Sequence, residues 1–140
     1  KASTTGTVYG VYDMSGGAGE YVAGYVNNGN SSLTSYGSSL VNGDAKTKNV
    51  YNKASSDNNT NNYNANSSKY GDAVYETSVN GSSSNSSWYG DWSNFPNTDW
   101  PFFKRGGYCS NGTDAGMFYF NNDSGGNNSE RSFRPVLTVL

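Results

Sequence analysis

The hydrophobic positions of this chain form a few short runs separated by long polar stretches. The runs at 7–12 (TVYGVY) and 20–26 (EYVAGYV) carry the β-branched and aromatic residues that strands favour. The Gly-rich segment that begins at Asp13 and lies between them is typical of a turn. The pattern therefore predicts two strands joined as a hairpin or corner.

Near the C-terminus, the runs at 102–109, 116–120 and 132–140 predict three more strands, because Gly, Asn and Asp turns separate them. The last strand needs a partner for its backbone groups. The strand predicted at 7–12 is the expected neighbour, which would bring the two ends of the chain into one small sheet.

The middle of the chain is polar, with isolated apolar positions. A short helix is predicted at 45–54, whereas 55–68 is an Asn/Ser tract without periodicity and predicts a loop. The stretch 41–68 is thus expected to form polar surface loops. The run at 73–79 predicts a strand or a helical turn.

Aromatic residues crowd into the segment 88–103, where two prolines make a long regular element unfavourable. The segment predicts an irregular, partly buried loop. Some rings would fill the core, while others would offer a sugar-stacking platform or a protein-binding patch. We expect Trp88, Tyr89 and Trp92 to be more exposed than Trp100, Phe102 and Phe103. The candidate ligand-binding residues are Trp88, Tyr89, Trp92, Asn94, Tyr108 and Asn111.

Composition supports an ordered single domain spanning 1–140. Only 33% of the 140 residues are apolar, but twelve Tyr, six Phe and three Trp supply large side chains for a core. Disordered chains are poor in such residues. Because the chain opens on Lys1, without an initiating Met or a signal peptide, we expect it to be the C-terminal part of a longer precursor.

Charge and hydropathy restrict the partners. The net charge is -2 and the nine Lys and Arg are scattered, which argues against a nucleic-acid partner. No apolar run approaches the roughly 20 residues of a membrane span, so we expect no membrane contact by this segment. The uncharged polar, aromatic-rich composition resembles that of exported or cell-surface proteins.

The sequence offers little for catalysis. It has no histidine, which excludes His-dependent triads and His-ligated metals, and its single cysteine, Cys109, excludes an internal disulfide. Cys109 is expected to be a buried or inert thiol. The acidic residues are spread singly, so no carboxylate pair is selected. We therefore expect no enzyme activity.

Calcium is the one cofactor that the loops near the C-terminus would suit. Asp114, Asn121 and Asp123 are the candidate ligands, because a hard cation prefers carboxylate and amide oxygens. The spacing matches no defined calcium loop. Ordinary turns capped by Asn and Asp side chains are the favoured alternative.

Charged residues within the strand-like runs suggest structural roles. Asp13 and Glu20 flank the Gly-rich turn, where a metal site or a general base is one interpretation. We favour a turn-capping Asp13 and an ion pair between Glu20 and a buried arginine, with Arg105 and Arg134 as candidates.

Three motifs carry a family resemblance. YGVYDMSGGAGEYV (9–22), FFKRGGY (102–108) and RSFRPVL (131–137) resemble, in the same order, three signatures of the formylglycine-generating-enzyme/sulfatase-modifying-factor superfamily. The resemblance implies an α+β, mainly β and loop-rich variant of the C-type lectin fold. Gly19 and Tyr21 stand where that family usually has two tryptophans. The family's enzymes use two cysteines for copper, whereas this chain has only Cys109.

A closer resemblance is to the C-terminal domains of prepilin-like surface proteins of Gram-positive bacteria. It implies a non-catalytic, extracellular, surface- or pilus-displayed module that acts as a structural subunit and in adhesion. The expected partners are copies of itself or a pilin-type subunit, with surface glycans or host proteins as further candidates. The alternatives are a free lectin-like module that binds carbohydrate or protein, with or without calcium, and a degenerate enzyme of the family.

Overall fold

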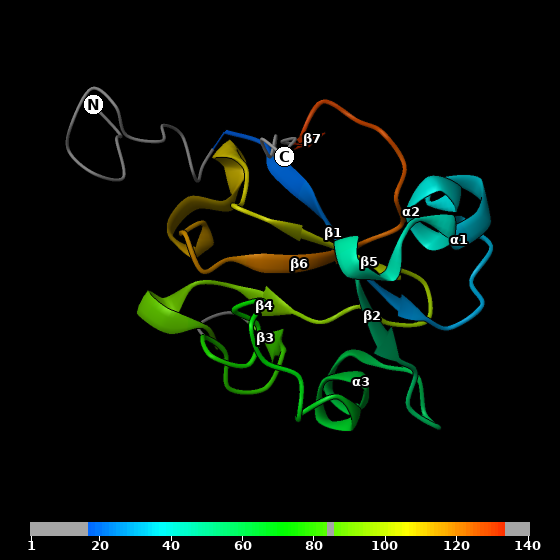
Figure 1. Cartoon of the computed structure of the whole chain (residues 1–140). Coiled ribbons are helices and arrows are strands. Elements are labelled where there is room, and N and C mark those ends of the chain that lie inside the picture. The colour runs from blue at the N-terminus through cyan, green and yellow to red at the C-terminus, as the bar shows by residue number, and fades with distance from the viewer. Residues whose placement is uncertain (1–16, 84–85, 134–140) are drawn as a thin grey trace.

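The computed structural model describes residues 17–83 and 86–133, which form a mixed α/β fold with one curled sheet and few helices (Figure 1). The strands are β1 (Gly19–Asn27), β2 (Asn49–Asn52), β3 (Ser82–Ser83), β4 (Ser93–Asn94), β5 (Phe102–Arg105), β6 (Phe120–Asp123) and β7 (Arg131–Phe133). The helices are α1 (Ser32–Ser35), α2 (Ser38–Asn42) and α3 (Asn59–Ala65), with 3-10 turns η1 (Ala45–Thr47), η2 (Trp88–Gly90) and η3 (Cys109–Asp114). Among the helices of these ranges, none is long and apolar enough to cross a membrane.

Strand β1 organises the sheet because it pairs with three other strands. It runs antiparallel to β5 along one edge. Along the other edge its start pairs in parallel with β7, with Gly19 opposite Arg131, and its end pairs in parallel with β2, with Gly24 opposite Asn49. From β5 the sheet continues through β6 and β4 to β3. The strand predicted at 20–26 is confirmed, and the C-terminal strand pairs with it.

A β-bulge interrupts the pairing of β1 with β5. Tyr21 lies opposite Lys104 and Tyr25 lies opposite Phe102, so three residues of β1 face the single residue Phe103. Such bulges bend a strand and locally disrupt the ladder. Because side chains alternate along a strand, Tyr21 and Tyr25 share one face of the sheet.

The two faces of the sheet carry separate aromatic clusters. The larger cluster consists of Val26, Tyr51, Tyr63, Val74, Phe95, Phe103 and Phe120. The opposite face carries Tyr25, Leu33 and Phe102. Phe102 and Phe103 are both buried, as predicted, and point to opposite faces because they are neighbours on one strand. Aromatic rings thus supply the core that the low apolar content requires.

Helix α3 corrects the prediction of a loop at 55–68. Asn58 caps the helix, since its side chain accepts a hydrogen bond from the Asn61 amide at 2.9 Å. Asn62 is fully buried, and its amide bonds the backbone of Ala54 and Pro96 at 2.8 and 3.0 Å. An Asn-rich sequence is typical of a loop, but here the amides replace apolar packing by satisfying buried backbone groups.

The rest of 41–68 also differs from the predicted surface loops. The helix expected at 45–54 is only the 3-10 turn η1, capped by Asp44, and the strand β2 follows it. Tyr51, at the centre of this stretch, is 1% exposed. The β-branched and aromatic pair Val50 and Tyr51 decides the local structure, because it fills the sheet beside β1.

Two further expectations are revised in the C-terminal half. The strand predicted at 116–120 begins only at Phe120, because residues 116–119 form a turn closed by the Tyr119 amide and the Gly116 carbonyl at 3.1 Å. Cys109 is exposed, which excludes a buried thiol and leaves an inert one as the prediction. By contrast, the helical turn at 73–79 is confirmed by the bond from the Ser78 amide to the Val74 carbonyl.

Some predictions lie outside the described residues. These are the strand at 7–12, its hairpin with 20–26, the turn-capping role of Asp13 and the ion pair of Arg134. They stay predictions.

Candidate functional site

Five of the six predicted ligand-binding residues, all except Trp92, lie in three places in the structure. Trp88 and Tyr89 belong to an exposed aromatic cluster. Asn94 lines a polar pocket. Tyr108 and Asn111 lie at the start of η3, where the Asn111 side chain accepts a hydrogen bond from the Tyr108 amide at 2.7 Å and caps the turn.

The aromatic cluster consists of Trp88, Tyr89 and Phe118. The Tyr89 ring stacks on Phe118 with centroids 5.7 Å apart, and Trp88 meets the same ring edge-on at 5.2 Å. Tyr89 is 90% exposed and has a φ of 61°, a left-handed conformation that non-glycine residues rarely adopt. The buried Asp91 carboxylate holds this arrangement, because it accepts the Phe118 amide at 2.8 Å.

The other two tryptophans reverse the predicted order of exposure. Trp92 is half-buried, and its indole Nε1 is buried without a hydrogen-bond partner within residues 17–83 and 86–133. Its backbone bridges the Asp114 carbonyl and the Phe120 amide, each at 3.1 Å. Trp100, expected to be less exposed than Trp92, is 48% exposed, although the next residue, Pro101, is buried.

Trp100 stands at a polar cavity of about 290 Å3, which we call the amide pocket. Its lining residues are Asn94, Trp100, Asn121, Asn122, Asp123, Ser124 and Arg131. Strands β4 and β6 run parallel, with Ser93 opposite Phe120, so the polar residues at their carboxyl ends meet at the same edge of the sheet. The structure thereby brings together Asn94, Asn121 and Asp123, which the sequence had assigned to separate ligand and metal sets.

Hydrogen bonds fix the orientation of the pocket amides. The Asn94 side chain accepts from Asn59 at 2.8 Å and donates to Asn122 at 3.3 Å. Asn122 in turn donates to the Phe95 carbonyl at 3.2 Å, and Asn121 donates to the Tyr119 hydroxyl at 2.9 Å. Each amide has two donors and an acceptor with two lone pairs, so these bonds leave capacity for a ligand.

One wall of the amide pocket is an almost buried charge cluster. Asp123, 3% exposed, lies 3.0 Å from both Lys104 Nζ and Arg131 Nε, and accepts the Tyr21 hydroxyl at 2.7 Å. Arg131 also donates through Nη1 to the Gly126 carbonyl at 2.6 Å. Two cations share one carboxylate, so the cluster carries a net positive charge.

The same contacts set the pKa values within the cluster. Burial raises the pKa of Asp123, but the Tyr21 hydroxyl and the Lys104 ammonium more than offset that effect, so the net shift is downward. Burial, followed by the Asp123 carboxylate, raises the pKa of Tyr21. Tyr21 therefore stays a protonated donor to Asp123.

The depressed pKa of Asp123 predicts acid sensitivity. Its stabilising contribution is present above the ordinary value of 3.8 and is lost as the pH falls through the lower folded value. We expect the difference in unfolding free energy between wild type and Asp123→Asn to shrink below about pH 4. Urea unfolding of both proteins at a series of pH values measures it, and a difference that is constant down to about pH 2 would contradict the assignment.

Two of the candidate calcium ligands, Asp123 and Asp114, have different surroundings in the structure. Asp123 already faces two cations, whereas Asp114 lies in η3 near Asp91, whose pKa is raised first by burial and then by that neighbouring charge. Within residues 17–83 and 86–133, no group of three or more His, Cys, Asp or Glu side chains gathers. Calcium stays a prediction from the sequence.

Glu20 and Arg105 are opposite each other in the strand register, and their ion pair stays a prediction. The Arg105 guanidinium donates to the Asp72 carbonyl at 2.5 Å and lies 5.7 Å from the Phe120 ring centroid. Burial lowers the pKa of Arg105.

Sequence reasoning noted Asn122 only as a polar neighbour of the calcium candidates, and it missed three residues of the amide pocket, which are Trp100, Ser124 and Arg131. The run NNDS at 121–124 offered a signal, because polar residues at the end of a strand are free to meet polar residues at the end of its parallel neighbour. Neither the parallel pairing of β4 nor the pairing of β7 with β1 is visible in the local pattern.

The described parts of the three family-like motifs include the start of β1 and the strands β5 and β7, and β1 pairs with each of the other two strands. This is a coarse agreement with a β-rich, loop-rich fold. No protein-family model, no curated protein and no solved structure matches the chain, so the lectin-like family stays a prediction from those motifs.

Proposed function

We propose that this chain is a non-catalytic recognition module that binds a saccharide in the amide pocket. The observation that supports it best is the exposed Trp100 indole at a cavity lined by amides, a hydroxyl and a guanidinium. The indole offers an apolar surface for one face of a sugar ring, and the amides offer donors and acceptors for its hydroxyls. A few polar groups that converge on a cavity are the usual basis of ligand specificity.

The charge of the pocket favours one class of saccharide. Asp123 is shared between Lys104 and Arg131, so the wall has an excess of positive charge. A sugar that carries a carboxylate would be attracted to this wall, whereas an amino sugar would be repelled. We therefore propose neutral or acidic sugars as ligands.

The setting that fits such a module is outside the cell. Display on a cell surface or a pilus, with adhesion as the outcome, follows from the composition and from the resemblance to prepilin-like proteins. A second candidate function rests on the aromatic cluster: the exposed, left-handed Tyr89 stacked on Phe118 suits a homotypic or pilin-type contact.

Removal of the indole tests the proposal. We expect Trp100→Ala to weaken binding of the best glycan found in an array by at least about tenfold, because tryptophan anchors commonly contribute 2 kcal/mol or more. Trp88→Ala is the matched control, since Trp88 is similarly exposed (55%, against 48% for Trp100) but lies in the aromatic cluster. Calorimetry with the purified glycan gives the affinities.

The outcomes separate the alternatives. Unchanged binding by Trp100→Ala together with lost binding by Trp88→Ala would move the site to the aromatic cluster. No binding to any neutral or acidic glycan, with and without calcium, would overturn the proposal. Loss of binding on chelation alone would restore calcium as a cofactor.

A further inference from the structure

A second cavity opens at the β-bulge of β1, on the sheet face that carries the larger aromatic cluster. It has a volume of about 400 Å3 and is lined by Val22, Ala23 and Gly24 at the bulge itself. We call it the bulge pocket. Its size falls within the range of small-molecule sites.

Gly24 keeps this pocket open. A Cβ atom there would lie 3.3 Å from the Phe103 ring and 3.8 Å from the Tyr51 ring. The missing side chain therefore leaves room above the floor of the pocket, which is built from Phe103, Val22 and Val74. Bulges commonly occur beside binding sites, because they re-aim side chains and interrupt the ladder.

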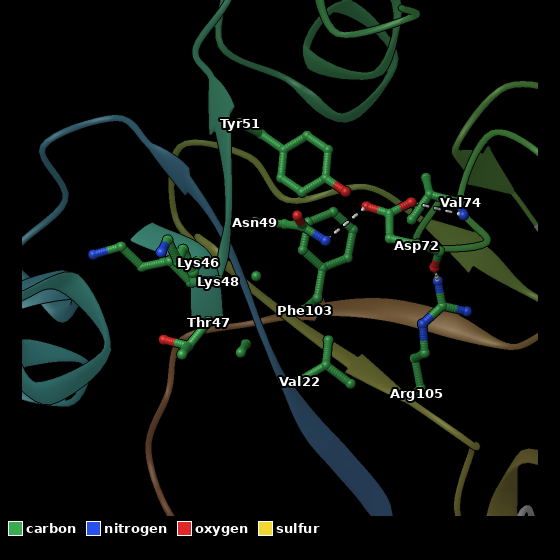
Figure 2. Close-up of a pocket in the computed structure, with 12 residues that line it drawn as sticks. Val22, Lys46, Thr47, Lys48, Asn49, Tyr51, Asp72, Val74, Phe103 and Arg105 are labelled. Atoms are coloured by element: carbon green, nitrogen blue, oxygen red, sulfur yellow. Dashed lines mark hydrogen bonds between the residues drawn. The ribbon is translucent and has the colours of Figure 1, made fainter. Parts of the chain in front are cut away.

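The polar groups of the bulge pocket stand on two opposite sides. Figure 2 shows Lys46 and Lys48 on one side and Asp72 and Arg105 on the other, with Phe103 between them. An apolar floor between charged walls suits a ligand with a flat apolar body and a charged end.

The Asp72 side is internally satisfied. The Asp72 carboxylate accepts the Val74 amide at 3.1 Å and the Asn49 side chain at 3.4 Å, while Arg105 donates to the Asp72 carbonyl. Glu20 lies opposite Arg105 on β1, and Glu76 also acts on the arginine charge. The charges of Asp72 and Glu76 thus act on the guanidinium on this side of the pocket.

The lysine side offers the available positive charge. The Lys48 ammonium caps α2 by donating to carbonyls that include those of Leu40 and Gly43, at 3.1 and 2.8 Å. Lys46, next to it, is exposed. Because the Lys48 ammonium is held by the α2 carbonyls, the exposed Lys46 supplies the charge that attracts an anion to this side, in a chain whose net charge is -2.

From this arrangement we propose that the bulge pocket binds a small organic carboxylate with an aromatic or similarly flat apolar body. The body lies against Val22 and Ala23, above the buried Phe103 and Val74, and the carboxylate faces Lys46. This site is separate from the amide pocket, and its test does not depend on the proposed saccharide binding.

Benzoate is the probe, with benzamide and acetate as analogues that lack the charge and the apolar body. We expect benzoate to shift the backbone amide resonances of residues 22–24 and 46–49 saturably, with a Kd in the order of millimolar, and each analogue to bind at least about fivefold more weakly. Two-dimensional NMR of the full chain provides the measurement.

Three variants complete the test. Lys46→Ala should weaken benzoate about threefold or more, whereas Lys53→Ala, which removes an exposed lysine outside the pocket, should leave it unchanged. Gly24→Ala should weaken benzoate binding, because the added methyl group occupies the cavity. The dispersion of the NMR spectrum should stay unchanged, which shows that the variant is folded. Equal binding of benzoate and acetate, equal effects of the two lysine variants, or no saturable shift at these amides would each overturn the proposal.

Discussion

Asparagine in place of Asp123 is expected to lower the free energy of unfolding by about 3–5 kcal/mol. The substitution keeps the shape of the side chain but removes the carboxylate that lies 3.0 Å from both Lys104 and Arg131. Two cations would then remain close together with little water around them. Removing one partner of a buried ion pair is costly, because the remaining charge stays desolvated. Equilibrium urea unfolding near neutral pH measures the loss.

Asp99→Asn is the matched control. Asp99 is an exposed acid, so the same chemical change there should alter the free energy of unfolding by no more than about 0.5 kcal/mol. If Asp123→Asn lowered the free energy of unfolding by less than about 1 kcal/mol, the charge cluster in the wall of the amide pocket would not stabilise the fold as we describe.

Truncation of Phe95 to alanine should be similarly damaging, with an expected loss of about 3–5 kcal/mol. Phe95 is fully buried, and its ring centroid lies 5.3 Å from that of Tyr51 and 5.0 Å from that of Phe103. These rings come from a loop and two strands, so the resulting cavity would be shared by segments that are distant in the sequence. Thermal and urea unfolding measure the loss.

Phe95→Leu separates the loss of ring contacts from the loss of filled volume. Leucine keeps an apolar side chain of similar reach, so we expect it to cost less than half as much as alanine. Equal losses for the two variants would show that the position depends on ring contacts rather than on filled volume. A loss below about 1 kcal/mol for alanine would mean that the surrounding rings close the cavity.

The sequence predicted the central strands because their apolar runs are local. The pattern at 20–26 became β1, and the run that begins at Phe102 became β5. Helix α3 was missed because its buried face is made of Asn62 and Tyr63 rather than of an apolar stripe. Amide side chains that bond buried backbone groups leave no signal in a hydrophobic pattern.

The amide pocket was only partly predictable for a different reason. Asn94 and Asn121 were recognised as polar candidates, but their meeting depends on the parallel pairing of β4 with β6, which is a long-range property. Trp100 was expected to be less exposed because it leads into the strand that begins at Phe102. Its exposure beside the buried Pro101 is a property of the folded chain that composition does not reveal.

The parallel pairing of β1 with β7 has a mechanical consequence. Gly19 lies opposite Arg131 and Tyr21 lies opposite Phe133, so the start of β1 and the end of β7 are at opposite ends of their shared ladder. A pulling force that enters through these two points would slide the strands past each other and load their hydrogen bonds together instead of peeling them apart in turn. Resistance to such tension is governed by the unfolding rate rather than by the equilibrium stability.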